Sequence, residues 1–150
     1  MREAIRISLE KMRRGGGGPF GAVIVRGGQI VARGWNKVTS TNDPTAHAEM
    51  VAIRAACRRL KRFHLDDCVL YTSCEPCPMC LSAVYWAHVR RVFYANSRRD
   101  ARRIGFNDEL IYREVARPIA QRRLPMREML RDEALVAFRE WEKKADRAPY

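Results

Sequence analysis

The sequence places one histidine and two cysteines where they can bind one metal ion. His47 lies in the segment Thr-Ala-His-Ala-Glu, and Cys77 and Cys80 are three positions apart in Pro-Cys-Pro-Met-Cys. Imidazole nitrogen and thiolate sulfur are good zinc ligands, and three protein ligands leave the fourth tetrahedral position open to water, as in catalytic sites. We therefore predict a catalytic zinc site formed by His47, Cys77 and Cys80.

Glu49 lies two residues after the expected histidine ligand, close enough to address the open position without being a ligand itself. Zinc acidifies a bound water towards neutral pH, and a nearby carboxylate can take the proton and hand it onward. His-x-Glu followed by Pro-Cys-x-x-Cys is the known pattern of zinc base deaminases. We predict that Glu49 is the catalytic proton carrier, and that backbone donors near Ala48 and Cys77, at two helix starts, polarise the site.

Each part of this pattern has another reading when it is taken alone. A Cys-x-x-Cys pair also occurs in structural zinc sites and redox sites, and a single histidine or glutamate on a helix is usually structural or solvated. Cys74 could supply a fourth ligand and close the site as a structural Cys3His centre. That arrangement would leave Glu49 without a role, so the combination favours catalytic zinc.

Apolar periodicity and turn residues predict strands that alternate with helices. This pattern predicts a three-layer α/β/α fold with a mixed five-stranded sheet, in a single domain over residues 1–150. The expected strands are 22–25, 30–35, 67–72, 89–94 and 124–129, and the expected helices are 4–12, 46–60, 78–88, 109–115 and 134–144.

Composition excludes several classes of protein. A chain of 150 residues with 47% hydrophobic residues can bury a core, and its apolar runs are far too short to span a bilayer. The chain opens on charged residues with no leader-like apolar segment, so we expect a cytoplasmic protein. Five cysteines, three of them within seven residues, favour metal binding over disulfides.

The net charge of +12 allows two interpretations. A strongly basic chain can bind nucleic acid. Here the excess is arginine, spread as separate pairs along the whole chain, which favours a solvated basic surface over a nucleic-acid footprint.

Long blocks of the sequence resemble the bacterial guanine deaminases of the cytidine-deaminase superfamily. The blocks are Gly-Pro-Phe-Gly-Ala-Val-Ile-Val at 18–25, Asn-Asp-Pro-Thr-Ala-His-Ala-Glu at 42–49 and Tyr-Thr-Ser-Cys-Glu-Pro-Cys-Pro-Met-Cys at 71–80. Shorter blocks at 83–87, 92–95 and 105–108 and the terminal tyrosine extend the likeness over nearly the full length. The resemblance implies a cytidine-deaminase-like fold and hydrolysis of guanine to xanthine and ammonia.

The resemblance also implies roles for residues outside the metal site. Asn36 would bind the purine, and Asp108 would contact the substrate and assist proton transfer. Tyr150 would reach the site from a C-terminal segment, about residues 130–150, that is exchanged in a homodimer. Phe20 and Trp86 would line the substrate pocket.

Some features leave other functions open. Asn107 stands where an acidic residue is common in the family, and residues 97–103 are unusually basic. A tRNA adenosine deaminase, which shares the metal motif and acts on a flipped base, is the nearest alternative. Another purine, nucleoside or triazine aminohydrolase, a cytidine deaminase and a non-enzymatic zinc module that binds RNA are the remaining ones.

Overall fold

A computed structural model describes residues 1–149, so the prediction for Tyr150 lies outside the described residues. Contacts divide the chain into two compact units, unit 1 from Met1 to Asp108 and unit 2 from Glu109 onward. Across residues 1–149, no helix has both the length and the apolar composition needed to cross a bilayer.

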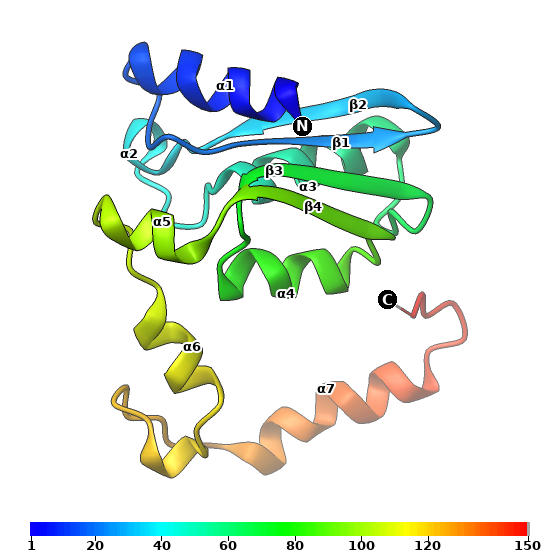
Figure 1. Ribbon diagram of the computed structural model, residues 1–150. Helices are drawn as coiled ribbons and strands as arrows, with labels where there is room; N and C mark the ends of the chain where they lie inside the picture. The colour runs from blue at the N-terminus through cyan, green and yellow to red at the C-terminus, as the bar shows by residue number, and fades with distance from the viewer. Residues whose placement is uncertain (150) are drawn as a thin grey trace. The chain divides into compact units, whose positions relative to one another are not determined.

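Unit 1 contains a mixed four-stranded sheet in the order β2-β1-β3-β4 (Figure 1). The strand β1 is antiparallel to both β2 and β3, whereas β3 and β4 are parallel. The strands are β1 (Gly21–Arg26), β2 (Gln29–Trp35), β3 (Cys68–Cys74) and β4 (Arg91–Asn96). The prediction of a mixed sheet is therefore confirmed.

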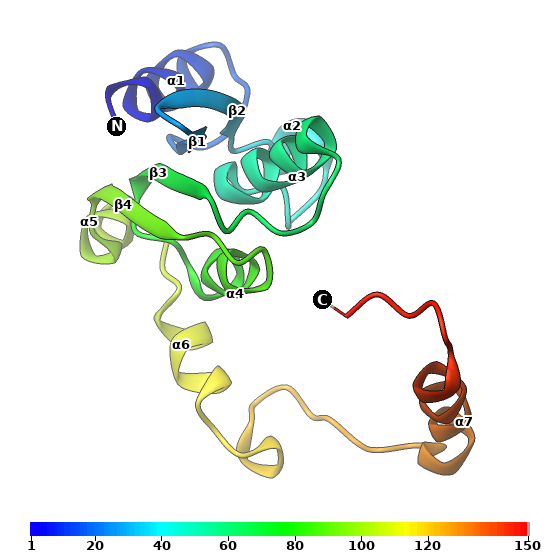
Figure 2. The ribbon, with the colours of Figure 1, turned by 90° about the vertical axis from the view of Figure 1, so that its right-hand side faces the viewer.

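Helices cover both faces of this sheet, because side chains alternate between the faces along each strand. The helix α1 (Arg2–Arg13) packs on one face, where Ile7 meets Val23. The helices α3 (Ala48–Leu60) and α4 (Pro78–Trp86) lie on the other face, where a core forms around Ile24 and Leu70 (Figures 1 and 2). Unit 1 thus has three layers.

The helix α3 approaches β2 closely at Gly34. A Cβ atom at Gly34 would lie 2.6 Å from the backbone nitrogen of Ala52 and closer still to the carbonyl oxygen of Ala48. Contacts this short do not occur with real side chains, so the packing of the first turns of α3 depends on glycine at this position.

Two short helices of unit 1 were not predicted, namely α2 (Val38–Thr41) and α5 (Arg98–Arg103). The helix α5 begins with a capping box, in which Ser97 and Asp100 each accept a hydrogen bond from the other's backbone N–H. Neither helix has an apolar stripe long enough to be detected by periodicity.

Unit 2 contains α6 (Glu109–Val115), the 3-10 turn η1 (Ile119–Gln121) and α7 (Arg131–Lys143). The predicted helices at 109–115 and 134–144 are confirmed. None of these three elements has a buried residue, and large apolar side chains such as Phe138 and Leu130 are exposed.

The predicted fifth strand is wrong. Residues 124–129 form no strand, and the described sheet has four strands with β4 at one edge. Pro125 lacks an N–H group for a ladder, and the short segment finds no partner strand in the described chain. Its alternating apolar residues therefore did not indicate a sheet position.

Candidate active site

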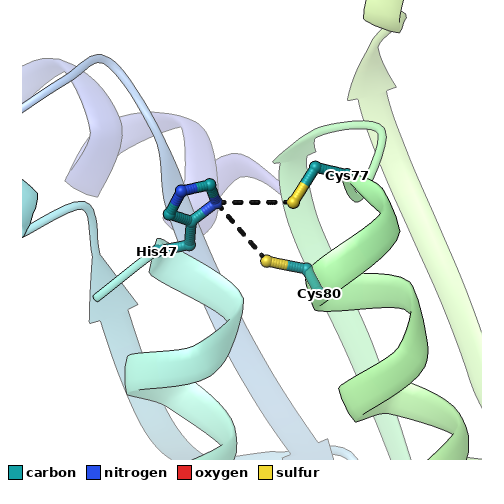
Figure 3. Close-up of side chains that lie close together, drawn as sticks. All are labelled: His47, Cys77 and Cys80. Carbon is teal, nitrogen blue, oxygen red and sulfur yellow. Dashed lines mark hydrogen bonds between the residues drawn. The ribbon is translucent and has the colours of Figure 1, made fainter. Parts of the chain in front are cut away.

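The three predicted metal ligands meet at the starts of two helices, as Figure 3 shows. His47 is the N-cap residue of α3, Cys77 is the N-cap residue of α4, and Cys80 follows on the first turn of α4. Pro78 occupies the first helical position after Cys77, where its fixed φ favours the helix start. We call these three residues the metal triad.

The spacing of the metal triad fits zinc. His47 Nδ1 lies 3.5 Å from Cys77 Sγ and 3.6 Å from Cys80 Sγ. Tetrahedral zinc with usual Zn–S and Zn–N bond lengths would separate nitrogen from sulfur by about 3.6 Å. The three donor atoms also lie within 4.8 Å of one another, as ligands of one ion must.

The alternative of a closed Cys3His centre is not supported. Among residues 1–149, the group that could hold a metal contains His47, Cys77 and Cys80 but not Cys74. The Cys74 thiol instead lies 3.7 Å from the carbonyl oxygen of Ser97. A set of three ligands with one open position is the arrangement of catalytic zinc.

The local electrostatics prepare a thiolate. The pKa of Cys77 is lowered to about 4, chiefly by the hydrogen bond from Cys80 and also by the contact with His47. The contact with Cys77 in turn raises the pKa of His47. Because zinc binds the thiolate form of cysteine, a low pKa at Cys77 favours metal binding at neutral pH.

Glu49 lies beside the metal triad and is almost fully buried, with 6% of its surface exposed. Its Oε1 atom accepts a 2.8 Å hydrogen bond from the hydroxyl of Thr72, which is buried on β3. Burial is the largest cause of a raised pKa at Glu49. A carboxyl group whose pKa moves from 4.5 towards neutrality is better suited to take up and release a proton.

Asn36 follows β2 and is held near the metal triad by backbone hydrogen bonds. Its own N–H donates to the carbonyl of Phe20 at 3.1 Å, and the N–H of Lys37 donates to the carbonyl of Ala46 at 2.9 Å. Since Ala46 immediately precedes His47, the second bond joins the end of β2 to the start of α3. The Asn36 side chain is buried, with 6% of the residue exposed.

Asp108 also lies in the surroundings of the metal triad. Burial is the main cause of its raised pKa, and the negative charge of Cys77 raises it further, while Arg98 opposes the shift. The Asp108 carboxyl is therefore close enough to Cys77 for their charges to interact. The substrate contact that the resemblance implies for Asp108 stays a prediction.

Glu75 holds the segment after β4, which leads to Asp108, by hydrogen bonds. The sequence did not predict this role. Its backbone N–H donates to the carbonyl of Asn96 at 2.8 Å, and its carboxylate accepts from the N–H of Arg98 at 2.9 Å. These bonds join the loop before α4 to the start of α5. The contact of Thr72 with Glu49 was not predicted either, although a polar residue inside a buried strand is a signal that could have indicated it.

The remaining predicted residues differ in position. Ala48 begins α3 directly after His47 and is fully buried, and Phe20 packs edge-on against Phe106 with 4.8 Å between ring centroids. Trp86 ends α4, about 13 Å along the helix axis from Cys77, and its side chain is exposed. The structure therefore does not bring Trp86 to the metal triad of its own chain.

Together, the mixed sheet, the two helix starts and the open three-ligand site define a zinc-dependent deaminase. Residues 1–96 match the family described as the cytidine and deoxycytidylate deaminase zinc-binding region. The chain belongs to this family and is a zinc-dependent hydrolase.

Known relatives include a guanine deaminase and tRNA deaminases. The guanine deaminase of Bacillus subtilis is 49% identical over 150 residues, covering 100% of this chain and 96% of that protein. A crystal structure of guanine deaminase from Bacillus subtilis matches 99% of this chain and 95% of its own with a TM-score of 0.96. The tRNA-specific adenosine deaminase of Aquifex aeolicus is 40% identical, over 61% of this chain and 62% of its own length.

Proposed function

We propose that this protein hydrolyses guanine to xanthine and ammonia. One observation carries the choice of substrate: the likeness to the Bacillus subtilis guanine deaminase extends through both units, at 49% identity over 100% of this chain. The site's geometry supports the reaction type, because a buried carboxylate adjoins an open three-ligand zinc site.

The metal triad would hold the zinc ion, and when bound the ion supplies an acidified water as nucleophile. Glu49 accepts the proton of that water and delivers it to the ring nitrogen beside the amine-bearing carbon. Glu49 then takes the second proton of that water, as its oxygen becomes the carbonyl oxygen of the product, and passes it to the departing amino group, which leaves as ammonia. The hydroxyl of Thr72 keeps the carboxyl of Glu49 oriented through both transfers.

The base would be positioned by residues around this centre. We assign the purine edge to Asn36 and a second proton-transfer contact to Asp108, and the backbone N–H groups at Ala48 and Cys77 would polarise the site. Phe20 would contact the flat ring. These assignments are supported by the placement of all five residues in unit 1 near the start of α3 or α4 or in segments bonded to them.

We also propose that the protein is a homodimer that exchanges its C-terminal segment, about residues 130–150, so that Tyr150 completes the partner's site. The exposed apolar side chains of unit 2 support this, because a chain segment without buried residues rarely folds alone. Tyr85 and Trp86, exposed on α4, would be covered by the second copy, and Trp86 would line a pocket in that way. Exchange would make residues 1–150 one folding domain.

A cytoplasmic location is part of the same proposal. Zinc binding uses the reduced thiols of Cys77 and Cys80, and all five cysteines are free. Thiols stay reduced in the cytosol, where a purine base would also be available.

A tRNA adenosine deaminase is the second candidate, since unit 1 carries most of the net charge. Unit 1 has 19 Lys and Arg residues against 9 Asp and Glu residues, whereas the chain from Glu109 onward has 10 against 8. Four of the arginines of unit 1 lie in α5. Phosphate contacts would make such binding fall steeply with salt.

Ammonia release from guanine, guanosine, adenine, adenosine, cytidine and tRNA, in separate reactions with zinc-loaded protein, tests the proposal. We expect release from guanine alone, and Glu49→Gln should keep zinc while turnover falls by at least roughly a thousandfold. Release from tRNA but not from guanine would select the second candidate. Zinc-loaded protein that is silent on every substrate would favour the non-enzymatic module.

A further inference from the structure

The glycine-rich segment at residues 15–18 is not explained by the zinc site, yet the structure lays it against Asn36. Gly17 has a φ of +137°, a backbone conformation that other residues rarely adopt. A Cβ atom at Gly17 would lie 2.9 Å from Asn36 Oδ1 and would overlap the carbonyl oxygen of Asn36. Only glycine therefore allows this segment to contact Asn36 so closely.

This contact brings two backbone donors to one atom. Asn36 Oδ1 accepts hydrogen bonds from the N–H groups of Gly18, at 3.2 Å, and Val38, at 3.3 Å. A carbonyl oxygen has two lone pairs, so the acceptor end of the carboxamide is fully used. Two N–H donors also determine which end of the amide is oxygen.

The other end of the carboxamide is left for a ligand. Within residues 1–149, Asn36 Nδ2 makes no hydrogen bond to protein. It is also not one of the side-chain polar atoms that are fully buried and lack a hydrogen-bond partner. Asn36 thus presents a donor and no acceptor. A ligand that pairs with it must offer an acceptor at that point.

We propose that Gly17 is a positioning residue that fixes the Asn36 carboxamide with Nδ2 outward, so that the site selects a base edge carrying a hydrogen-bond acceptor. This inference rests on the proposed function, in which Asn36 binds the purine. Away from the reacting carbon, guanine offers acceptors at N7 and O6, whereas its ring N1 carries a proton and is a donor. A base that turns an N–H group towards Asn36 would face a second donor, and both groups would remain unpaired.

A matched pair of glycine substitutions tests the positioning role. Gly17→Ala pushes on Asn36, whereas Gly15→Ala also adds a side chain at a positive φ, of +70°, but with nothing within 4 Å of the new Cβ. We expect Gly17→Ala to raise KM for guanine about tenfold, or about 1.4 kcal/mol, with kcat within about twofold and zinc content unchanged. Gly15→Ala should leave KM unchanged, and equal KM values in the two variants would overturn the inference.

Substrate analogues test which property of the base is read. The wild type should show a raised KM with 7-deazaguanine or with 2-aminopurine, which lack N7 and O6 respectively. With the analogue that lacks the acceptor bound by Asn36, Gly17→Ala should not raise KM any further. A full tenfold rise with both analogues would contradict the selection of an acceptor.

Two further measurements keep the inference testable if Gly17→Ala does not fold or guanine is not turned over. Asn36→Asp retains an oxygen for the Gly18 and Val38 donors but loses the outward donor, so its KM should rise at least tenfold; an unchanged KM would overturn the inference. The side-chain amide signals of Asn36 in 15N-labelled protein should move in Gly17→Ala and not in Gly15→Ala. An inactive wild type with that shift would refute guanine as substrate and leave the positioning role supported.

Discussion

Glu49 is the residue on which the chemistry of the site depends, and its surroundings determine how well it can work. The Glu49 carboxyl is buried, and its Oε1 atom accepts a hydrogen bond from the hydroxyl of Thr72 on β3. The hydroxyl of Thr72 orients this buried carboxyl, and the Cys80 thiol of the metal triad also interacts with it. The strand residue therefore positions the proton carrier without touching the metal triad.

At this scale we predict the effect of Thr72→Val, which keeps the side-chain shape and removes the hydroxyl. We expect kcat to fall roughly tenfold with zinc content unchanged, because Glu49 loses its orienting hydrogen bond. Steady-state kinetics with metal analysis measures both quantities. Thr41→Val is the control, since the hydroxyl of Thr41 donates to Lys37 O at 2.8 Å on the exposed helix α2 and should not affect kcat. Equal kcat values for wild type and Thr72→Val would refute the positioning role.

Among the elements, α3 matters most, because His47 is its N-cap residue and Glu49 lies in its first turn. The close approach at Gly34 places this turn against β2, and the bond from Lys37 to Ala46 joins the same two elements. The site geometry is thus a consequence of how one helix packs on the sheet. Changes in that packing should therefore alter zinc binding.

Gly34→Ala should show this coupling. Overpacking at a tight contact costs about 1–3 kcal/mol, and a shift of α3 would also separate His47 from the cysteines. We expect a lower free energy of unfolding in urea together with weaker zinc retention. Gly28→Ala, at φ +79° in the hairpin turn with nothing within 4 Å, should lose stability by backbone strain and keep its zinc. Normal zinc retention in a destabilised Gly34→Ala protein would contradict this prediction, because the packing of α3 on β2 would then not affect metal binding.

The ends of three elements are joined by Asp67, and this predicts a dependence of stability on pH. Asp67 Oδ2 accepts from Arg26 Nε at 2.6 Å, and Asp67 Oδ1 pairs with Arg62. The hydrogen bond from Arg26 is the largest cause that lowers the pKa of Asp67 to about 2. A folded-state pKa below the unfolded value means that the contribution is present above about pH 4 and is lost as pH falls towards 2.

Asp67→Asn should therefore have a lower urea midpoint than wild type at pH 6, and the difference should vanish near pH 2. Measurements of the midpoint across this range test the prediction. A difference that persisted at the acid end would mean that the ion pair is not its source.

For the whole molecule, the main feature is that unit 2 leaves its apolar side chains uncovered. Phe138, Leu130 and Met129 are 71%, 66% and 75% exposed. Exposed apolar surface of this extent in a folded protein indicates an interface. The proposed homodimer supplies the missing cover.

We expect a solution mass of twice the 17.4 kDa of the chain, measured by light scattering after size exclusion. Phe138→Asp should shift the protein towards the monomer or lower its stability, because the charge would be buried at the interface. Glu142→Gln, on the exposed surface of the same helix, is the control. A monomeric wild type would refute the dimer.

The sequence predicted the metal triad well, because Cys77 and Cys80 are placed by a single helix turn and the His-x-Glu pair by another. It also predicted each long helix and the four strands. It failed at residues 124–129, where a strand needs a partner that local sequence does not reveal. The contact of Thr72 with Glu49 joins residues 23 apart, and the approach of Gly17 to Asn36 depends on tertiary packing, so neither could be read from spacing.

The most direct test of the account is a zinc titration of metal-free protein with guanine as substrate, followed by xanthine formation. The account predicts no turnover without zinc and a rate that rises linearly to a plateau at one zinc per chain. In Cys80→Ser the plateau should be lost, because the metal triad is incomplete. Xanthine formation that is independent of zinc, or no xanthine from the fully loaded protein, would contradict the central claim.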